Sequence, residues 1–289
     1  MNTVIYFFGS GLAFLVGLGL LLLAIGLLIG VKRNWLRSLA SLLSILGAIL
    51  VALSATPLPY WLYVSGGIVW FAWLIVERVS SERGRRWRVG LRVAVVAVVG
   101  LALALEMPYQ FTPRLDPGRQ RRLTIFADSV TAGTGDKVRT WPRLLAAGHP
   151  IQVIDHSEMG ATVQTMLRKA RTLTLEDGVV LLEIGGNDLL GTTSAAVFEE
   201  RLDELLALLA GEGRTLVMFE LPLPPFANAF GLVQRRLASK HDVVLVPKRV
   251  FAAILTANQA TIDSIHLSPT GHERMADVVW HIIEPACAD

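Results

Sequence analysis

The stretch Val179-Val180-Leu181-Leu182-Glu183-Ile184-Gly185-Gly186-Asn187-Asp188 decides the fold of this chain. Its first six residues form an almost continuously apolar, β-branched run, and a Gly-Gly-Asn-Asp turn ends it. Such a run is typical of a strand that lies in a parallel sheet and is buried on both faces. Polar residues directly after such a strand stand where parallel α/β folds bind their ligands.

Four similar apolar runs and several helical patterns surround this strand. Strands that alternate with helices predict a three-layer α/β/α domain with a parallel sheet. The other predicted strands are Leu123–Ala127, Ile151–Ile154, Thr215–Phe219 and Val243–Val246, and the predicted helices are Val163–Ala170, Ala195–Ala210, Ala229–Ser239 and Pro269–Ile283. For the last helix, Ser268 is a suitable N-cap and Pro269 suits the first helical position.

A second polar turn follows the first predicted strand, in Phe126-Ala127-Asp128-Ser129-Val130. Because Ser129 comes directly after the strand, it is a candidate nucleophile at the ligand-binding edge of the sheet. The alternative is an ordinary cap or turn residue.

Asp263 and His266 stand in the loop before the last predicted helix. An Asp three residues before a His can accept a hydrogen bond from the imidazole, which leaves the other ring nitrogen to take a proton from a serine. The alternative is a pair of solvated loop residues.

Acyl transfer also needs hydrogen-bond donors that point at the developing oxyanion. The side-chain amide of Asn187 is one candidate donor. The N–H of Gly160, in the turn after the second predicted strand, is another. The alternative for both is a turn without a chemical role.

These segments, in this order and spacing, resemble the sequence blocks of the SGNH/GDSL hydrolase superfamily. The resemblance implies a flavodoxin-like α/β/α fold, with Ser129 as the nucleophile, His266 as the base and Asp263 as its partner. It also implies an oxyanion hole formed by the N–H groups of Ser129 and Gly160 and by the amide of Asn187.

The resemblance covers about residues 123–289, and it departs from the family at two positions. Where the family usually reads Gly-Asp-Ser-Leu, this chain has Ala127-Asp128-Ser129-Val130. The methyl group of Ala127 narrows the space near the nucleophile, which puts the rate or the substrate range in doubt rather than the chemistry.

Residues 1–108 form a separate apolar region, which a linker over residues 109–122 joins to the predicted hydrolase domain. About 20 apolar residues are needed for a helix that spans a membrane, and the region predicts four spans. They are Val4–Gly30, Trp35–Ala55, Tyr60–Val76 and Val89–Met107. A cleaved signal peptide is the alternative for the first, but it lacks a basic leading segment.

The loops between the predicted spans indicate their orientation. The loop Thr56-Pro57-Leu58-Pro59 has no charge, whereas the other two loops are basic through Lys32, Arg33, Arg37, Arg78, Arg83, Arg85, Arg86 and Arg88. Basic loops favour the cytoplasmic side. We therefore expect an integral protein of a bacterial inner or plasma membrane with an extracytoplasmic, periplasmic catalytic domain.

The remaining charged residues give no sign of nucleic-acid binding or of a metal. Residues 108–289 carry 18 Lys and Arg against 21 Asp and Glu, whereas a nucleic-acid partner requires a basic face. The histidines lack metal-ligand spacing, no nucleotide-binding glycine motif occurs, and no cofactor is predicted. His272 is interpreted as structural, and the pairs Arg235-Arg236 and Lys248-Arg249 as solvated.

The sequence thus predicts a membrane-anchored serine esterase or lipase. Its substrates would be acyl esters, O-acetyl esters included, of cell-envelope lipids or glycans, and its partners would be membrane lipids. One alternative is a transacylase that uses the same three residues. Another is a catalytically silent, carbohydrate-binding scaffold.

Overall fold

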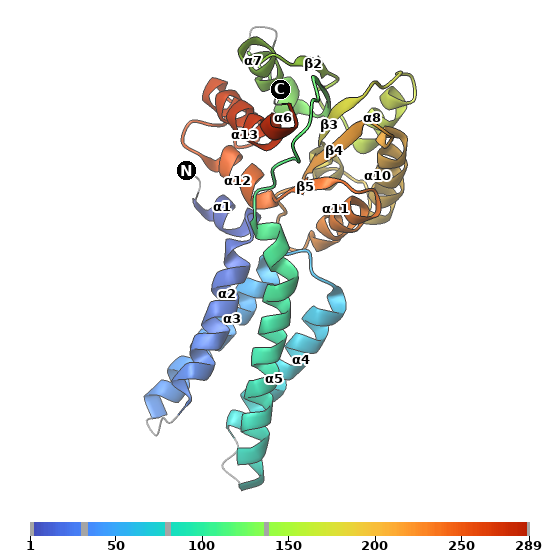
Figure 1. Ribbon diagram of the computed structural model, residues 1–289. Helices are drawn as coiled ribbons and strands as arrows, with labels where there is room; N and C mark the ends of the chain where they lie inside the picture. Colours follow the sequence, from blue (N-terminus) through green and yellow to red (C-terminus); the bar gives the residue numbers. More distant parts are fainter. Residues whose placement is uncertain (1–2, 30–33, 79–81, 136–138, 288–289) are drawn as a thin grey trace.

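The structure is a computed structural model, and it describes residues 3–29, 34–78, 82–135 and 139–287 (Figure 1). Five parallel strands form one sheet in the order β2-β1-β3-β4-β5. Their bounds are β1 Arg122–Ala127, β2 Gln152–Asp155, β3 Gly178–Glu183, β4 Arg214–Phe219 and β5 Val244–Val246. The predicted parallel sheet is confirmed, and every predicted strand lies within one residue of its observed bounds.

Helices cover both faces of the sheet, so the fold has the predicted three layers. One face packs against α8 (Val163–Ala170), α10 (Ala195–Leu209) and α11 (Asn228–Lys240). The other packs against α7 (Trp141–Gly148), α12 (Lys248–Thr256) and α13 (Pro269–Cys287). Successive residues of β3 alternate between the two cores, because side chains of a strand point alternately to opposite faces. The continuous apolar run of β3 follows from this double burial.

The helical region extends from one end of the α/β domain as a group of long helices (Figure 1). It consists of α1 Thr3–Gly9, α2 Leu12–Leu27, α3 Asn34–Leu53, α4 Tyr60–Glu77 and α5 Glu82–Glu106, followed by the short 3-10 helix η1 Met107–Gln110. The first predicted span, Val4–Gly30, is divided into two helices, because α1 and α2 meet at a bend of 74°. Gly11 at this bend has a φ of 86°, a conformation that glycine adopts without steric cost.

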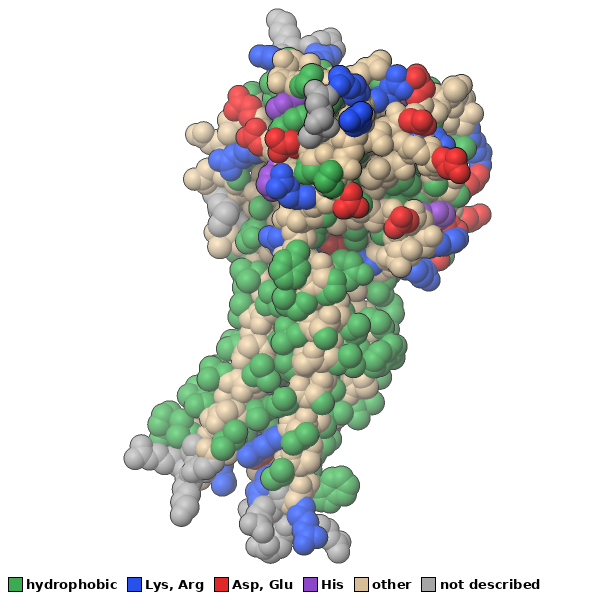
Figure 2. Space-filling view, viewed as in Figure 1, with side chains coloured by type: hydrophobic (Ala, Val, Ile, Leu, Met, Phe, Trp, Pro, Cys, Tyr) green, Lys and Arg blue, Asp and Glu red, His purple; other side chains and the backbone are tan. Residues whose placement is uncertain are grey.

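Three of the described helices are long and apolar enough to cross a membrane, and the bent pair would make a fourth if it forms one span. The three are Asn34–Leu53, Tyr60–Glu77 and Arg86–Gln110. Figure 2 shows an almost uncharged, hydrophobic surface along these helices and charged side chains over the α/β domain. Lys32 and Arg33, which entered the prediction of orientation, lie outside the described residues, as do the side chains of Arg83 and Arg85.

Buried polar contacts join the helical region to the α/β domain. Arg235 on α11 donates to Glu106 at the end of α5 (2.6 Å) and to Glu220 after β4 (2.7 Å). All three side chains are at most 6% exposed. Lys248 is also buried, and its backbone N–H donates to Glu220. The interpretation of Arg235 and Lys248 as solvated residues is wrong, because each lies against the helical region.

The uncharged loop between α3 and α4 is part of the same contact. Asn228 donates its side-chain N–H to the carbonyl of Thr56 (2.8 Å), and Arg235 donates to the carbonyl of Pro57 (3.3 Å). Glu220 directly follows β4 and Lys248 lies two residues after the end of β5, so this contact lies at the carboxyl edge of the sheet. We name these residues (Thr56, Pro57, Glu106, Glu220, Asn228, Arg235 and Lys248) the docking cluster.

The segment between the two regions lies against α13. The N–H groups of Leu115, Gly118 and Gln120 donate to carbonyls at the end of that helix. The connection is therefore fixed on the α/β domain by backbone hydrogen bonds.

Candidate active site

Ser129 is the first residue of the short helix α6 (Ser129–Ala132), directly after β1. The Asp128 carboxylate caps this helix by accepting from the N–H of Val130 at 2.9 Å. The backbone N–H of Asp128 donates to the carbonyl of Glu183 on the neighbouring strand β3. The turn from strand to helix is therefore held at both sides of the serine.

The structure brings Ser129, His266 and Asp263 together, although 134 positions separate the first from the last. Nε2 of His266 lies 3.1 Å from Oγ of Ser129, and Nδ1 of His266 lies 2.6 Å from Oδ2 of Asp263. Ser129 is 7% exposed, while the side chain of Asp263 is 52% exposed. The imidazole thus connects a buried hydroxyl to a carboxylate at the surface.

A tight turn fixes the carboxylate of Asp263 beside the imidazole. Oδ1 of Asp263 accepts from the N–H groups of Ile265 (3.1 Å) and His266 (2.8 Å), and Ser264 between them has a φ of 78°. The hydrogen bond from the His266 side chain, followed by those from the backbone, lowers the pKa of Asp263 to about 2. Asp263 is therefore charged at neutral pH and suited to stabilise an imidazolium.

Gly160 lies in the turn after β2, and Asn187 lies on the short helix α9 (Gly186–Leu190) after β3, at the same edge of the sheet. Nδ2 of Asn187 donates to the carbonyl of Ala161 at 2.9 Å, which ties its amide to the turn that contains Gly160. Gly160 has a φ of 72°, a conformation that favours glycine. The amide has two N–H donors, so one remains for a substrate oxygen.

Buried polar residues that the sequence analysis missed lie beneath the nucleophile turn. Oε2 of Glu183 accepts from the hydroxyl of Thr131 in α6 (2.9 Å), and the Thr131 hydroxyl accepts from the indole N–H of Trp141 (3.0 Å). The N–H of Trp141 donates to Nδ1 of His272 at 3.3 Å. The one sequence signal for this network was a glutamate at the end of an otherwise apolar run. His272 has the structural role expected of it.

Burial determines the charge of these groups. Burial raises the pKa of Asp128 to about 6 and that of Glu183 well above its ordinary value, and it lowers the pKa of His272 to about 4. Glu183 is fully enclosed beside Asp128, so its protonated form is favoured. A neutral Glu183 acts as a hydrogen-bonding support for α6 rather than as a charge.

The raised pKa of Glu183 predicts a loss of folding stability with rising pH, and Glu183→Gln should remove this loss. The folded state holds the proton above the ordinary pKa of 4.5, whereas the unfolded state releases it. Stability of the wild type therefore falls as the pH rises above that value. Because each pH unit corresponds to about 1.4 kcal/mol per proton, the melting temperature of Glu183→Gln should gain on that of the wild type as the pH rises from 4.5 towards neutrality.

Differential scanning fluorimetry in detergent measures these melting temperatures. Glu176→Gln is the matched control, because Glu176 is exposed and pairs with Arg122 at the surface. The difference in melting temperature between Glu176→Gln and the wild type should not vary with pH in this way. A constant difference for Glu183→Gln would show that Glu183 is charged in the folded protein.

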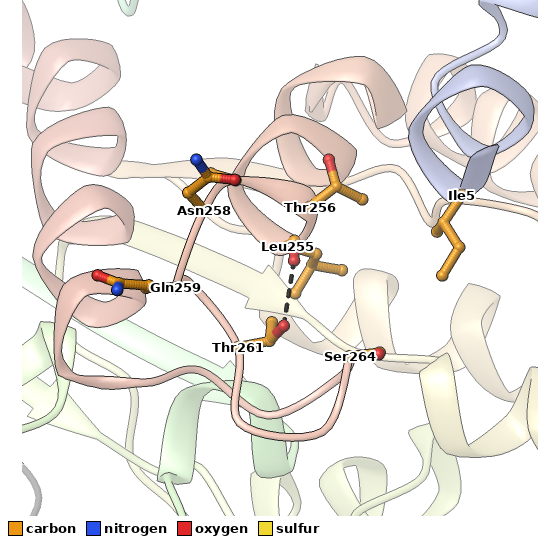
Figure 3. Close-up of a pocket in the computed structure, with 8 residues that line it drawn as sticks. Ile5, Leu255, Thr256, Asn258, Gln259, Thr261 and Ser264 are labelled. Atoms are coloured by element: carbon orange, nitrogen blue, oxygen red, sulfur yellow. Dashed lines mark hydrogen bonds between the residues drawn. The ribbon is translucent and has the colours of Figure 1, made fainter. Parts of the chain in front are cut away.

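The helical region reaches the loop that carries Asp263. A pocket of about 410 Å³ lies between Ile5 of α1 and the segment from Leu255 to Ser264. Figure 3 shows residues that line it, among which Thr261 donates to the carbonyl of Leu255. Ser264 directly follows Asp263. The first helix of the chain therefore lies beside the loop of the candidate site.

An imidazole that connects a serine hydroxyl to a carboxylate is the arrangement by which serine hydrolases activate their nucleophile. This chain is an enzyme of that class that acts on ester bonds. It belongs to the GDSL-like lipase/acylhydrolase family, whose model matches residues 128–274. The resemblance to the SGNH/GDSL superfamily is thereby confirmed.

Known esterases are similar to somewhat more than half of the chain. Esterase TesA of Pseudomonas aeruginosa is 26% identical over 176 residues, which are 56% of this chain and 88% of the relative. An arylesterase of Vibrio mimicus is 26% identical over 171 residues, 55% of this chain and 86% of the relative. The solved structure of a psychrotrophic esterase EstA from Pseudoalteromonas sp. has a TM-score of 0.52 at 20% identity and covers 57% of this chain and 97% of its own. That structural likeness shows the shared fold.

Proposed function

We propose that this protein is a membrane-anchored serine esterase whose nucleophile is Ser129, with His266 as the base and Asp263 as its partner. The observation that carries the proposal is the continuous hydrogen-bond series from Oγ of Ser129 through His266 to Asp263. Ser129, Gly160 and Asn187 form the oxyanion hole.

In the proposed mechanism, Nε2 of His266 accepts the proton of the Ser129 hydroxyl as Oγ attacks the ester carbonyl. The negative carboxylate of Asp263 stabilises the imidazolium, and N–H donors stabilise the oxyanion. The carbonyl re-forms, the bond to the alcohol breaks, and His266 returns the proton to the leaving alkoxide oxygen. Water then repeats these steps on the acyl-enzyme, which releases the acid and free Ser129.

We further propose that residues 1–108 anchor residues 123–289, through the connection 109–122, to the outer face of a bacterial inner or plasma membrane. The α/β domain, the uncharged loop Thr56–Pro59 and the end of α5 lie at one end of the helices. Arg78 directly follows α4, and Arg86 lies near the start of α5, both at the opposite end of these helices. This distribution of basic residues supports a periplasmic catalytic domain.

Exposed apolar side chains near the site favour acyl-lipid esters as substrates. Met159, Leu190, Ile262 and Ile265 are each at least 43% exposed, and each lies within three residues of a proposed site residue. Leu190 ends helix α9, and the other three lie in loops or turns near the carboxyl edge of the sheet. Burial of part of an acyl chain against them would remove apolar surface from water, which contributes a binding free energy of about 25 cal/mol per Å².

A series of p-nitrophenyl esters from acetyl to decanoyl tests this substrate class. The variant Met159→Ser/Ile262→Ser should lose about tenfold in kcat/KM for the decanoyl ester, because about 1.4 kcal/mol of apolar contact corresponds to tenfold. Its kcat/KM for the acetyl ester should stay unchanged.

Leu208→Ser is the matched control, because Leu208 is an exposed leucine on α10, a helix that carries no proposed site residue. It should leave both activities as in the wild type. A wild-type preference for acetyl esters, with no selective loss in the double variant, would assign O-acetylated glycans instead of lipids.

A further inference from the structure

Two helical hairpins make up most of the N-terminal region, and the first is tightly packed within itself. α2 and α3 approach so closely at Gly17 and Gly47 that a Cβ atom at Gly17 would lie 2.7 Å from the carbonyl oxygen of Gly47. Such backbone contact between small residues is typical of helices that associate in membranes. Little free space therefore lies between α2 and α3.

A cavity of about 270 Å³ lies where α2 and α3 meet the second hairpin, α4 and α5. Buried side chains from three of these helices, Phe14, Leu62 and Val99, form part of its wall. Among the described residues that line it, none is charged, and Tyr63 and Trp70 are the two that carry polar side-chain atoms.

The cavity opens sideways, between α3 and α4. Among the residues that line it, Ala52 on α3 and Gly67 on α4 are exposed at the surface of the helical region. An added Cβ atom at Gly67 would meet no other atom within 4 Å. Two small residues therefore border a lateral mouth.

The wall determines what the cavity can hold. A buried water needs two to four polar partners. The wall offers few, because the Tyr63 hydroxyl already donates to the carbonyl of Thr56 (2.7 Å), which leaves the indole N–H of Trp70 as a donor. An apolar cavity of about 150 Å³ is already large enough to bind benzene, so this cavity has room for a length of hydrocarbon chain. The surrounding helix surface exposes large apolar residues such as Leu42 and Val93, each 63% exposed, which suit a lipid environment.

We propose that this cavity is a binding site for one acyl chain of a membrane lipid, which enters between α3 and α4. The proposal rests on the proposed membrane location of these helices, but it is independent of ester hydrolysis. The bound chain fills the space between the two hairpins and so completes the packing of the helical region beneath the docking cluster.

Photolabelling of the full-length protein in lipid nanodiscs tests the proposal. The probe is phosphatidylcholine with a diazirine near the end of one acyl chain, and the labelled residues are identified by mass spectrometry. A chain in the cavity labels Leu62 and Val99, which are only 4% and 2% exposed. Label on the exposed residues Leu42 and Val93 indicates ordinary contact with the bilayer.

Gly67→Leu should block the mouth and abolish labelling of Leu62 and Val99, while Leu42 and Val93 stay labelled. Gly19→Leu is the matched control, because Gly19 is exposed on α2 outside the cavity wall and an added Cβ atom there would meet no atom of another element within 4 Å. The probe should label this variant at the same residues as the wild type. If Gly67→Leu does not fold, Ala52→Leu blocks the same mouth from α3.

Each other outcome has a defined meaning. Absence of label at Leu62 and Val99 in the wild type, or label that persists in both mouth variants, would overturn the acyl-chain site. Absence of label at Leu42 and Val93 as well would overturn the proposed membrane location, and the acyl-chain site with it. Cleavage of p-nitrophenyl acetate in the same samples tests the esterase assignment separately.

Discussion

Replacement of Ser129 with alanine should lower kcat/KM for p-nitrophenyl esters by about 10⁴- to 10⁶-fold, because the oxygen that attacks the ester is removed. The melting temperature should change little, since the serine hydroxyl contacts His266 at the edge of the domain and not its core. A fluorophosphonate probe should label Ser129 in the wild type and leave the variant unlabelled.

Ser239→Ala is the matched control, because Ser239 is an exposed serine on α11. It should retain the activity and the probe labelling of the wild type. Equal activity of Ser129→Ala and Ser239→Ala would exclude Ser129 as the nucleophile. If Ser129 is labelled but esters are not turned over without an added alcohol, the enzyme is a transacylase.

Replacement of Arg235 with alanine should destabilise the protein by about 3–5 kcal/mol, the largest effect on stability that we expect. Arg235 lies between the carboxylates of Glu106 and Glu220, and its removal leaves both buried without their partner. The free energy of unfolding is measured by guanidinium titration in detergent, followed by tryptophan fluorescence.

Arg236→Ala is a closely matched control, one residue further along the same helix. The side chain of Arg236 is 60% exposed and pairs with Glu199 at the surface, where such a pair contributes at most about 1 kcal/mol. A loss of similar size in both variants would mean that the docking cluster adds no special stability. A double variant, Glu106→Gln/Arg235→Met, should recover part of the loss, because it leaves fewer buried charges unpaired.

The sheet and the nearby site residues were predictable because their signals are local. Each strand is a short apolar run, and parallel strands bring their carboxyl ends to one edge regardless of their distance in sequence. Ser129 and His266 therefore meet although 137 positions separate them and the loop that carries His266 has no regular sequence pattern. The short helices α7 and α12 were missed, since eight or nine residues give too few turns for a clear 3.6-residue period.

The contacts between the two regions were not predictable in the same way. Arg235 stands next to Arg236 in sequence, and an adjacent pair of arginines is usually solvated. Only the tertiary structure shows that one of them faces Glu106, 129 positions away, and that the other faces solvent. The bend at Gly11 was missed because hydropathy measures how apolar a segment is and does not detect a change of direction.

The docking cluster also limits how this protein can be modified or recombined. Its charges and carbonyl acceptors come from both regions, with Pro57 and Glu106 on one side and Glu220 and Arg235 on the other. A catalytic domain excised from this chain would carry half of a matched surface without its counterpart. The two halves are thus not interchangeable modules, and substitutions at these positions must be compatible across the boundary for the chain to fold as one molecule.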